Sequence, residues 1–336
     1  MKRNLYILSL FLMSTAAFVS CSYDEWTDPI STQVPEKSFI VKDTVKVKFT
    51  NGGAVVDLPL GRDDVSYVIS NGYVTLTNAN DTEELVFVLS GSSNNGGLIY
   101  NGIYKCTMIL DNLSLVSSQG PAIDIECGKR IAVKLTEGSV NYFEDAAGGA
   151  HKGCFYCRGH IQLSGNGELN VKGNTANGIH VKEYLHVGTS FGTLNISQTV
   201  GHAVKVGEEV EIQGGTFNLT VNNEDTKALN TDSTLTISGG TFNVVANGDG
   251  TRGIQANYDI EINENDGPTN IIVEANGGKC SDENEHRCMG IKTDLVFKMS
   301  AGYVKVTKQK NSARGIRCLS KELTGGTCDA EFKEGL

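Results

Sequence analysis

The 336-residue sequence contains little of what marks several common protein classes. It has 5 Pro, 5 Met and 1 Trp, and 20% of its residues are charged. No segment is rich in Lys and Arg and the formal net charge is −10, which argues against nucleic acid as a partner. Apolar residues do not recur at the helical spacing of about 3.6 positions, so few helices are expected. The longest apolar run, residues 5–19, is too short for an ordinary membrane span.

Glycine and apolar residues, by contrast, are plentiful. Gly accounts for 39 residues and hydrophobic types for 39% of the chain. This composition predicts many turns around a packed core and excludes a disordered or collagen-like chain.

The N-terminus has the form of a bacterial lipoprotein signal. Lys2 and Arg3 precede the apolar run, which ends directly before Cys21. We expect residues 1–20 to be removed and Cys21 to carry lipid; the alternative is an ordinary signal-peptidase cut with Cys21 incidental. Residues 22–25 resemble the acidic export signal of surface lipoproteins. The prediction is an outer-membrane protein exposed at the cell surface, with residues 21–38 as a flexible tether and the lipid as its only membrane contact.

A 25-residue repeat determines the predicted fold. Apolar residues recur every 25 positions from Ile179 to Ile254, and the series extends in both directions around short insertions. The residue before each member is Gly or Ala, which indicates a tight bend or a close backbone approach. The nine members are Leu98, Ile123, Cys154, Ile179, Val204, Leu229, Ile254, Ile291 and Ile316.

Each period also contains two further alternating segments, for example around residues 210–212 and 217–221. Three short strands per 25 residues predict an all-β, right-handed, single-stranded parallel β-helix of about nine coils. A propeller needs longer repeats and a sandwich keeps no constant period. We assign residues 39–90 to an N-terminal β cap, 91–320 to the β-helix and 321–336 to a C-terminal cap or tail.

Several ordered motifs resemble a known bacterial family. They are residues 74–77 (VTLT), 87–91 (FVLSG), 109–114 (ILDNLS), 120–123 (GPAI), 135–139 (LTEGS) and 159–169 (GHIQLSGNGEL), together with the Gly-Ile repeats. In this order they resemble the carbohydrate-binding parallel β-helix family. The resemblance implies binding of plant-type or acidic polysaccharide, usually with calcium, on a fold like that of polysaccharide lyases but without clear lyase activity.

Calcium needs converging oxygen ligands, six to eight of them. The family pattern places Asp on both sides of the Gly-Ile pair, whereas this sequence has Asn177 before it and Lys182 after it. The best remaining candidates are Glu224, Asp225 and Asp249, since residues 225 and 249 lie almost one coil apart. The alternative is that these are solvated turn acids.

Two outward columns of the repeat contain no acid from residue 180 onward. Because side chains in adjacent coils lie about 4.8 Å apart, such columns could bind the carboxylates or sulfates of an extended glycan. The alternative is a solvated face that balances acids elsewhere. In this register Phe155 also faces outward. The candidate binding residues are His180, Lys205, Asn230, Gln255, Lys292 and Arg317 in one column, and His202, Lys227 and Arg252 in the column that also holds Met289 and Arg314.

These observations favour a non-catalytic surface protein that binds anionic, uronic-acid-type polysaccharide, with unknown glycan-uptake partners. A calcium-dependent uronic-acid lyase is the first alternative, with Lys205, Lys227 or Arg252 as a base if its pKa were depressed. Glycoside hydrolysis would need a carboxylate pair such as Asp225 and Asp249. A structural or adhesive stalk is the remaining alternative.

Eight cysteines follow Cys21, an even number that permits disulfides in an exported protein. We prefer a bridge between Cys280 and Cys288, which flank a loop insertion. Cys127 and Cys157 form a second possible pair. The Cys154-x-x-Cys157 spacing also fits half of a zinc or redox site, but simple packing of Cys154 is the favoured interpretation.

Overall fold

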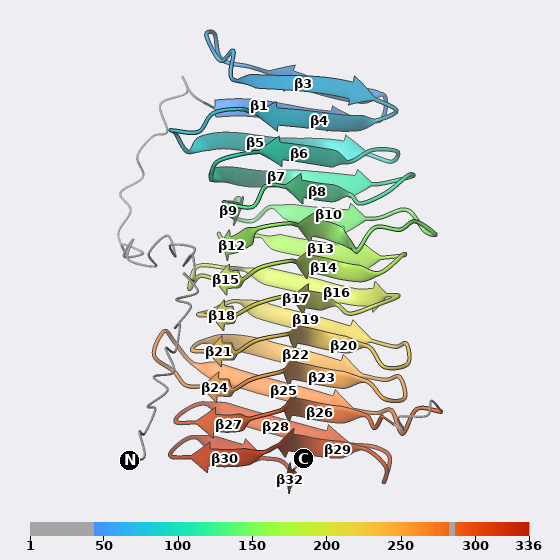
Figure 1. The fold of residues 1–336 in the computed structure, drawn as a ribbon, viewed down its shortest axis with the longest axis vertical. Helices are drawn as coiled ribbons and strands as arrows, with labels where there is room; N and C mark the ends of the chain where they lie inside the picture. The colour runs from blue at the N-terminus through green and yellow to red at the C-terminus, as the bar shows by residue number, and fades with distance from the viewer. Residues whose placement is uncertain (1–43, 282–285, 336) are drawn as a thin grey trace, which may run out of the picture. The chain divides into compact units, whose positions relative to one another are not determined.

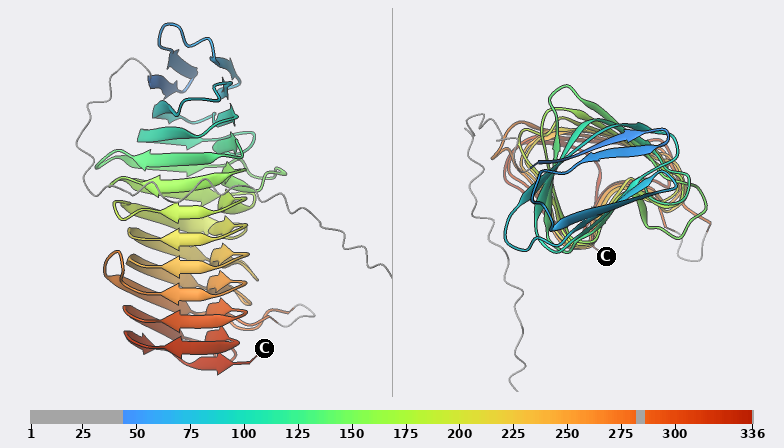
Figure 2. Two further views of the ribbon diagram at one scale, coloured as in Figure 1. Left: turned by 60° about the vertical axis from the view of Figure 1, so that its left-hand side comes forward. Right: turned by 90° about the horizontal axis from the view of Figure 1, so that it is seen from above.

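The computed structural model describes residues 44–281 and 286–335, which lie within one compact unit, Lys42–Leu336. The chain winds into a parallel β-solenoid of about ten coils stacked as a column (Figure 1). Viewed along the column, the coils superimpose on one outline (Figure 2). The described part of the chain contains no helix, and therefore no helix that could cross a membrane. The predicted all-β solenoid is confirmed.

The strands belong to two sheets, here named sheet A and sheet B. Sheet B forms one side of the column and contains β3 (Val65–Ser70), β4 (Tyr73–Asn78), β6 (Leu98–Gly102), β8 (Ile123–Glu126), β11 (Gly153–Cys157), β14 (Asn177–Val181), β17 (Val204–Val206), β20 (Lys227–Thr231), β23 (Arg252–Ala256), β26 (Met289–Thr293), β29 (Arg314–Cys318) and β32 (Phe332–Glu334). Sheet A contains β1 (Thr44–Thr50), β2 (Gly53–Asp57), β5 (Leu85–Ser93), β7 (Cys106–Val116), β9 (Arg130–Leu135), β10 (Val140–Glu144), β12 (His160–Ser164), β13 (Glu168–Gly173), β15 (Leu185–Val187), β16 (Thr193–Thr199), β18 (Val210–Ile212), β19 (Thr216–Val221), β21 (Leu235–Ile237), β22 (Gly240–Ala246), β24 (Ile260–Ile262), β25 (Thr269–Ala275), β27 (Val296–Met299), β28 (Tyr303–Lys308), β30 (Ser320–Leu323) and β31 (Thr327–Asp329).

Equivalent residues of successive coils pair in register, as the repeat predicts. In sheet B, Ile179 pairs with Val204, which pairs with Leu229. Their side chains are buried and form part of one continuous core. A middle coil supplies three strands, such as β17, β18 and β19, and each pairs in parallel with its equivalent in the next coil. Alternation along each strand therefore sends every second side chain outward.

One coil departs from the predicted register. Phe155, rather than Cys154, pairs with Ile123 and Ile179, and the Phe155 side chain is only 2% exposed. Tyr156 consequently occupies the outward position that the sequence assigned to Phe155. The preceding coil is longer than 25 residues, and this extra length hid a shift of one position. In a strand such a shift exchanges the inner and outer faces.

The small residues before the core positions are required by close packing. A Cβ atom on Gly253 would lie 2.4 Å from Cγ1 of Val273 and 2.6 Å from the carbonyl oxygen of Gly290. A Cβ atom on Gly290 would lie 2.1 Å from Cγ1 of Val306. Neither glycine has a positive φ. At these two positions, close approach of sheet A side chains and not a tight bend excludes a larger residue.

Parallel stacking extends beyond both boundaries that the sequence suggested. At the N-terminal end, β4 pairs in parallel with β6 and β1 with β5, so coil-like pairing precedes residue 91. The antiparallel strands β2 and β3 supply the cap. At the other end, β31 and β32 continue the parallel pairing after residue 320. Residues 1–43, including Cys21 and the predicted signal and tether, lie outside the described residues.

Substitution Gly253→Ala should destabilise the fold by about 1–3 kcal/mol, because the added methyl group overlaps backbone that cannot move independently of its coil. Gly188→Ala is the matched control, since its nearest neighbour would be the Leu163 carbonyl oxygen at an ordinary 3.7 Å. Urea unfolding of both variants measures the difference. Equal midpoints for the two variants would contradict the packing explanation.

Candidate functional site

The two predicted columns exist on the outer surface of sheet B. The first file contains His180, Lys205, Asn230, Gln255, Lys292 and Arg317, which pair in this order from coil to coil. The second file contains His202, Lys227, Arg252, Met289 and Arg314. Most of these side chains are half-buried, but Asn230 and Met289 are only 3% exposed and Arg252 only 5%. Asn230 is therefore too enclosed to be a main ligand contact.

Acids in the adjoining turns neutralise much of this positive charge. Lys205 forms an ion pair with Asp232, and Nζ of Lys292 lies 2.7 Å from the Asp294 carboxylate. Asp294 follows Lys292 by two residues, and Asp232 follows Asn230, the partner of Lys205 in the next coil, by two residues, so both acids lie in turns that leave sheet B. These two lysines are therefore each paired with an acid, as a charge-balanced face would require.

Asp225 is the acid shared by the cations in the middle of the second file. It forms ion pairs with Arg252 and, at 3.3 Å, with Nζ of Lys227. His286 Nδ1 lies 3.1 Å from the same carboxylate. These cations keep the pKa of Asp225 below its usual value in spite of its partial burial.

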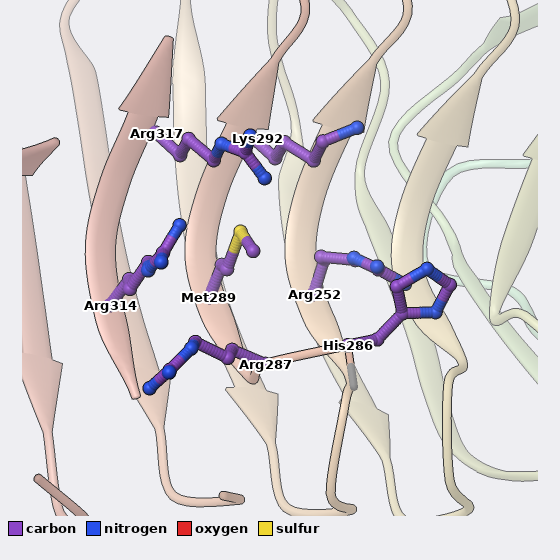
Figure 3. A pocket seen from close by; sticks show the side chains of 7 residues that line it. All are labelled: Arg252, His286, Arg287, Met289, Lys292, Arg314 and Arg317. Carbon is purple, nitrogen blue, oxygen red and sulfur yellow. The ribbon is translucent and has the colours of Figure 1, made fainter. Parts of the chain in front are cut away.

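The C-terminal end of the two files forms a pocket of about 300 Å³. Figure 3 shows Arg314, Met289 and Arg252 side by side on neighbouring strands, with the first file on one side of them and the residues that lead into β26 on the other. The thioether of Met289 separates the two guanidinium groups of its file. The lining residues are Arg252, His286, Arg287, Met289, Lys292, Arg314 and Arg317.

Three arginines give this pocket an excess of positive charge. Within residues 44–281 and 286–335, none of Arg287, Arg314 and Arg317 forms a salt bridge; Arg287 Nη1 donates only to the Ser312 carbonyl, at 3.3 Å. Burial, followed by repulsion from the other two arginines, lowers the pKa of Arg314. Nε of Arg317 and Nε of Arg252 are buried without a hydrogen-bond partner. Such unmatched donors favour an anionic ligand.

Two half-buried histidines occupy the opposite end of the files. Burial, with neighbouring lysines, lowers the pKa of His180 and His202 to about 4. Nδ1 of His202 accepts a hydrogen bond of 3.2 Å from the backbone N–H of Lys227, which requires an unprotonated Nδ1. These imidazoles are neutral near pH 7, so the positive charge of the face depends on Arg and Lys.

The predicted calcium ligands do not fit a calcium ion. The backbone N–H of Asp225 does donate to the Asp249 carbonyl at 3.0 Å, so the two residues are adjacent as expected. Asp225 already faces cations, however, while Asp249 Oδ1 accepts from Lys310 Nζ at 2.8 Å and Glu224 accepts from the Ser281 N–H at 2.9 Å. No group of three potential metal-ligating side chains occurs among the described residues.

The preferred disulfide is not formed in the structure. The Cys288 thiol is free and buried, and donates toward the Ala246 carbonyl at 3.6 Å. Lys279 pairs with Arg287 in an antiparallel bridge, which places Cys280 opposite His286 and diagonal to Cys288. Diagonal positions are farther apart than directly opposite ones, so the geometry disfavours a bond. Cys127, Cys154 and Cys157 are also buried thiols, consistent with packing.

Sequence reasoning missed part of the cationic pocket. Arg314 belonged to an acid-free column but was not chosen as a binding residue. Arg287 and His286 lie in the insertion between β25 and β26, which interrupts the repeat, so periodicity could not place them. The sequence feature that could have revealed these two residues is the basic pair His286-Arg287, which lies just before β26.

The neutral state of His202 should make stability depend on pH. The unfolded chain protonates this residue near its ordinary pKa of 6.5 and the folded chain near 4. Its stabilising contribution is therefore complete above about pH 6.5 and is lost as the pH falls toward 4. We expect a smaller loss of melting temperature between pH 7 and 4.5 in His202→Gln than in the wild type. Parallel pH curves for the two proteins would contradict this assignment.

Comparison with known proteins places the chain in a family. One relative, a carbohydrate-binding domain-containing protein of Acetivibrio thermocellus, is 25% identical over 116 residues, which are 32% of this chain and 41% of that protein. The chain thus matches less than half of that relative's length. A solved polysaccharide lyase-like protein from C. thermocellum, in a gadolinium derivative, aligns with a TM-score of 0.49 and 17% identity over 81% of this chain and 99% of its own. The model of the carbohydrate-binding domain-containing protein family matches residues 70–333, and the chain belongs to that family, whose ligand is carbohydrate.

Proposed function

We propose that this protein binds anionic, uronic-acid-type polysaccharide on the outer face of sheet B without cleaving it. The observation that carries the proposal is the pocket in which Arg287, Arg314 and Arg317 lack acidic partners within the described residues, although the whole chain has a net charge of −10. A concentration of unmatched cations in an acidic protein is costly unless an anion joins it.

The spacing of the face suits a linear polymer. Adjacent strands lie about 4.8 Å apart, so the first file offers polar groups at a regular interval along the column. Lys205, Gln255 and Lys292 lead from the middle of the column to Arg317 at its end. A chain lying along this file would end with an acidic substituent in the pocket.

A uronic-acid lyase is the second candidate, because burial and the nearby Arg252 lower the pKa of Lys227. A lyase base must be unprotonated to remove a proton. Nζ of Lys227, however, donates to the Asp225 carbonyl at 2.7 Å and to its carboxylate at 3.3 Å, which favours the charged ammonium. The carboxylates Asp225 and Asp249 are likewise held by cations. Binding without cleavage fits this arrangement better.

The proposal includes attachment to the outer membrane. Removal of residues 1–20 would leave Cys21 to carry lipid, and residues 21–38 would connect it to the solenoid. The first described strand, β1, begins at Thr44. A surface location would let the protein present captured polysaccharide to glycan-uptake partners; a purely adhesive stalk would not require a cationic pocket.

We expect binding to polygalacturonate in titration calorimetry, with an affinity that falls steeply as the salt concentration rises, because charge attraction is screened. Arg317→Gln should weaken binding about tenfold through the loss of a charge-assisted hydrogen bond. Lys134→Gln is the charge-matched control, since Lys134 is exposed on β9 in sheet A and should leave affinity unchanged. Equal losses in both variants would show that net charge, not this face, determines binding.

The same mixtures test catalysis. Incubation with polygalacturonate and calcium should release no unsaturated sugar absorbing in the ultraviolet. Release that disappears in Lys227→Gln would instead establish the lyase.

A further inference from the structure

The pocket differs from the rest of the face in both charge and shape, and its geometry bears on which anion it accepts. Lysines along the first file are matched by nearby acids, whereas the pocket arginines have no acid partner in the described part of the chain. We propose that the pocket formed by Arg287, Arg314 and Arg317 binds a sulfate ester carried by the glycan. This inference rests on the proposed anionic-glycan function and specifies the substituent that the pocket selects.

The three guanidinium groups enter the pocket from different parts of the chain. Arg314 and Arg317 belong to β29 but to different files, in which they pair with Met289 and Lys292. Arg287 comes from the segment that leads into β26 and is paired with Lys279 outside the solenoid wall. Figure 3 shows their side chains on separate edges of the pocket. The three guanidinium groups therefore reach the pocket from three backbone positions, two on β29 and one beside β26.

This arrangement suits a tetrahedral oxyanion better than a carboxylate. A carboxylate is planar, and its two oxygens are matched by one bidentate guanidinium group. A sulfate ester presents three terminal oxygens in three directions, so it can accept hydrogen bonds from several arginines at once. The buried Nε of Arg317, which has no partner, offers one such donor.

The walls of the pocket support the same assignment. Lys292 is paired with Asp294, and Arg252 shares the Asp225 carboxylate with Lys227, so these two residues add less unpaired charge than the three arginines. Met289 is 3% exposed and lies between Arg252 and Arg314, which limits access of water to the floor. At about 300 Å³ the pocket is at the small end of ligand sites. It can take a substituent of one sugar, not a length of chain.

The test compares two polymers of equal charge density, one of them sulfated, and a third polymer of lower charge. Chondroitin sulfate has one carboxylate and one sulfate in each disaccharide, and polygalacturonate has two carboxylates in the same length. Unsulfated chondroitin has one carboxylate in each disaccharide and no sulfate. By titration calorimetry at fixed ionic strength, the wild-type protein should bind chondroitin sulfate at least about tenfold more tightly than either of the others.

Arg314→Lys separates geometry from charge, because it keeps the positive charge and removes the planar fork. We expect the affinity of this variant for chondroitin sulfate to fall more than its affinity for polygalacturonate, so that most of the preference for the sulfated polymer is lost. Lys134→Gln should keep that preference. Thermal melts of each variant show whether it is folded.

The outcomes distinguish the inference from the function on which it rests. Equal affinity for chondroitin sulfate and polygalacturonate, both salt-dependent, would overturn the sulfate assignment and leave the anionic-glycan function intact. Binding to none of the three polymers would overturn both. Inorganic sulfate should compete only weakly compared with chondroitin sulfate; competition at equal concentration would identify the free ion, not the ester, as the ligand.

Discussion

The close approach of sheet A to sheet B is the constraint on which the rest of the structure depends. Glycine at positions such as 253 and 290 lets valine side chains from sheet A pack against the sheet B backbone. Aromatic packing supports the same register, since the rings of Phe217 and Phe242 stack at 4.6 Å and 6° in adjacent coils. With the inner side fixed in this way, each outward residue must fall in line with its equivalent in the next coil, and that alignment creates the two files.

Charge is distributed unequally along the resulting face. The N-terminal part contains Asp124, whose burial and the nearby Glu126 raise its pKa to about 6. In the middle, turn acids such as Asp225 compensate the cations of the second file. Toward β29, Arg314 and Arg317 have no acidic partner at all within the described residues. The face therefore has a direction, and a bound polyanion would gain most at its C-terminal end.

The sequence predicted the fold well because the fold is periodic. The repeat predicted about nine coils, and the structure has about ten. The register was wrong at Cys154 and Phe155, where an irregular loop concealed a shift of one residue. The same periodicity placed the files correctly. It could not show that Asp232 neutralises Lys205, or that Arg287 joins the pocket, because turns and insertions follow no repeat.

A crystal structure of the protein with a bound uronic-acid oligosaccharide tests the central claim most directly. We predict electron density for the sugar on the outer face of sheet B, across β26 and β29, with an acidic group in contact with Arg314 and Arg317. Density confined to sheet A, or to the N-terminal cap strands β2 and β3, would contradict this account.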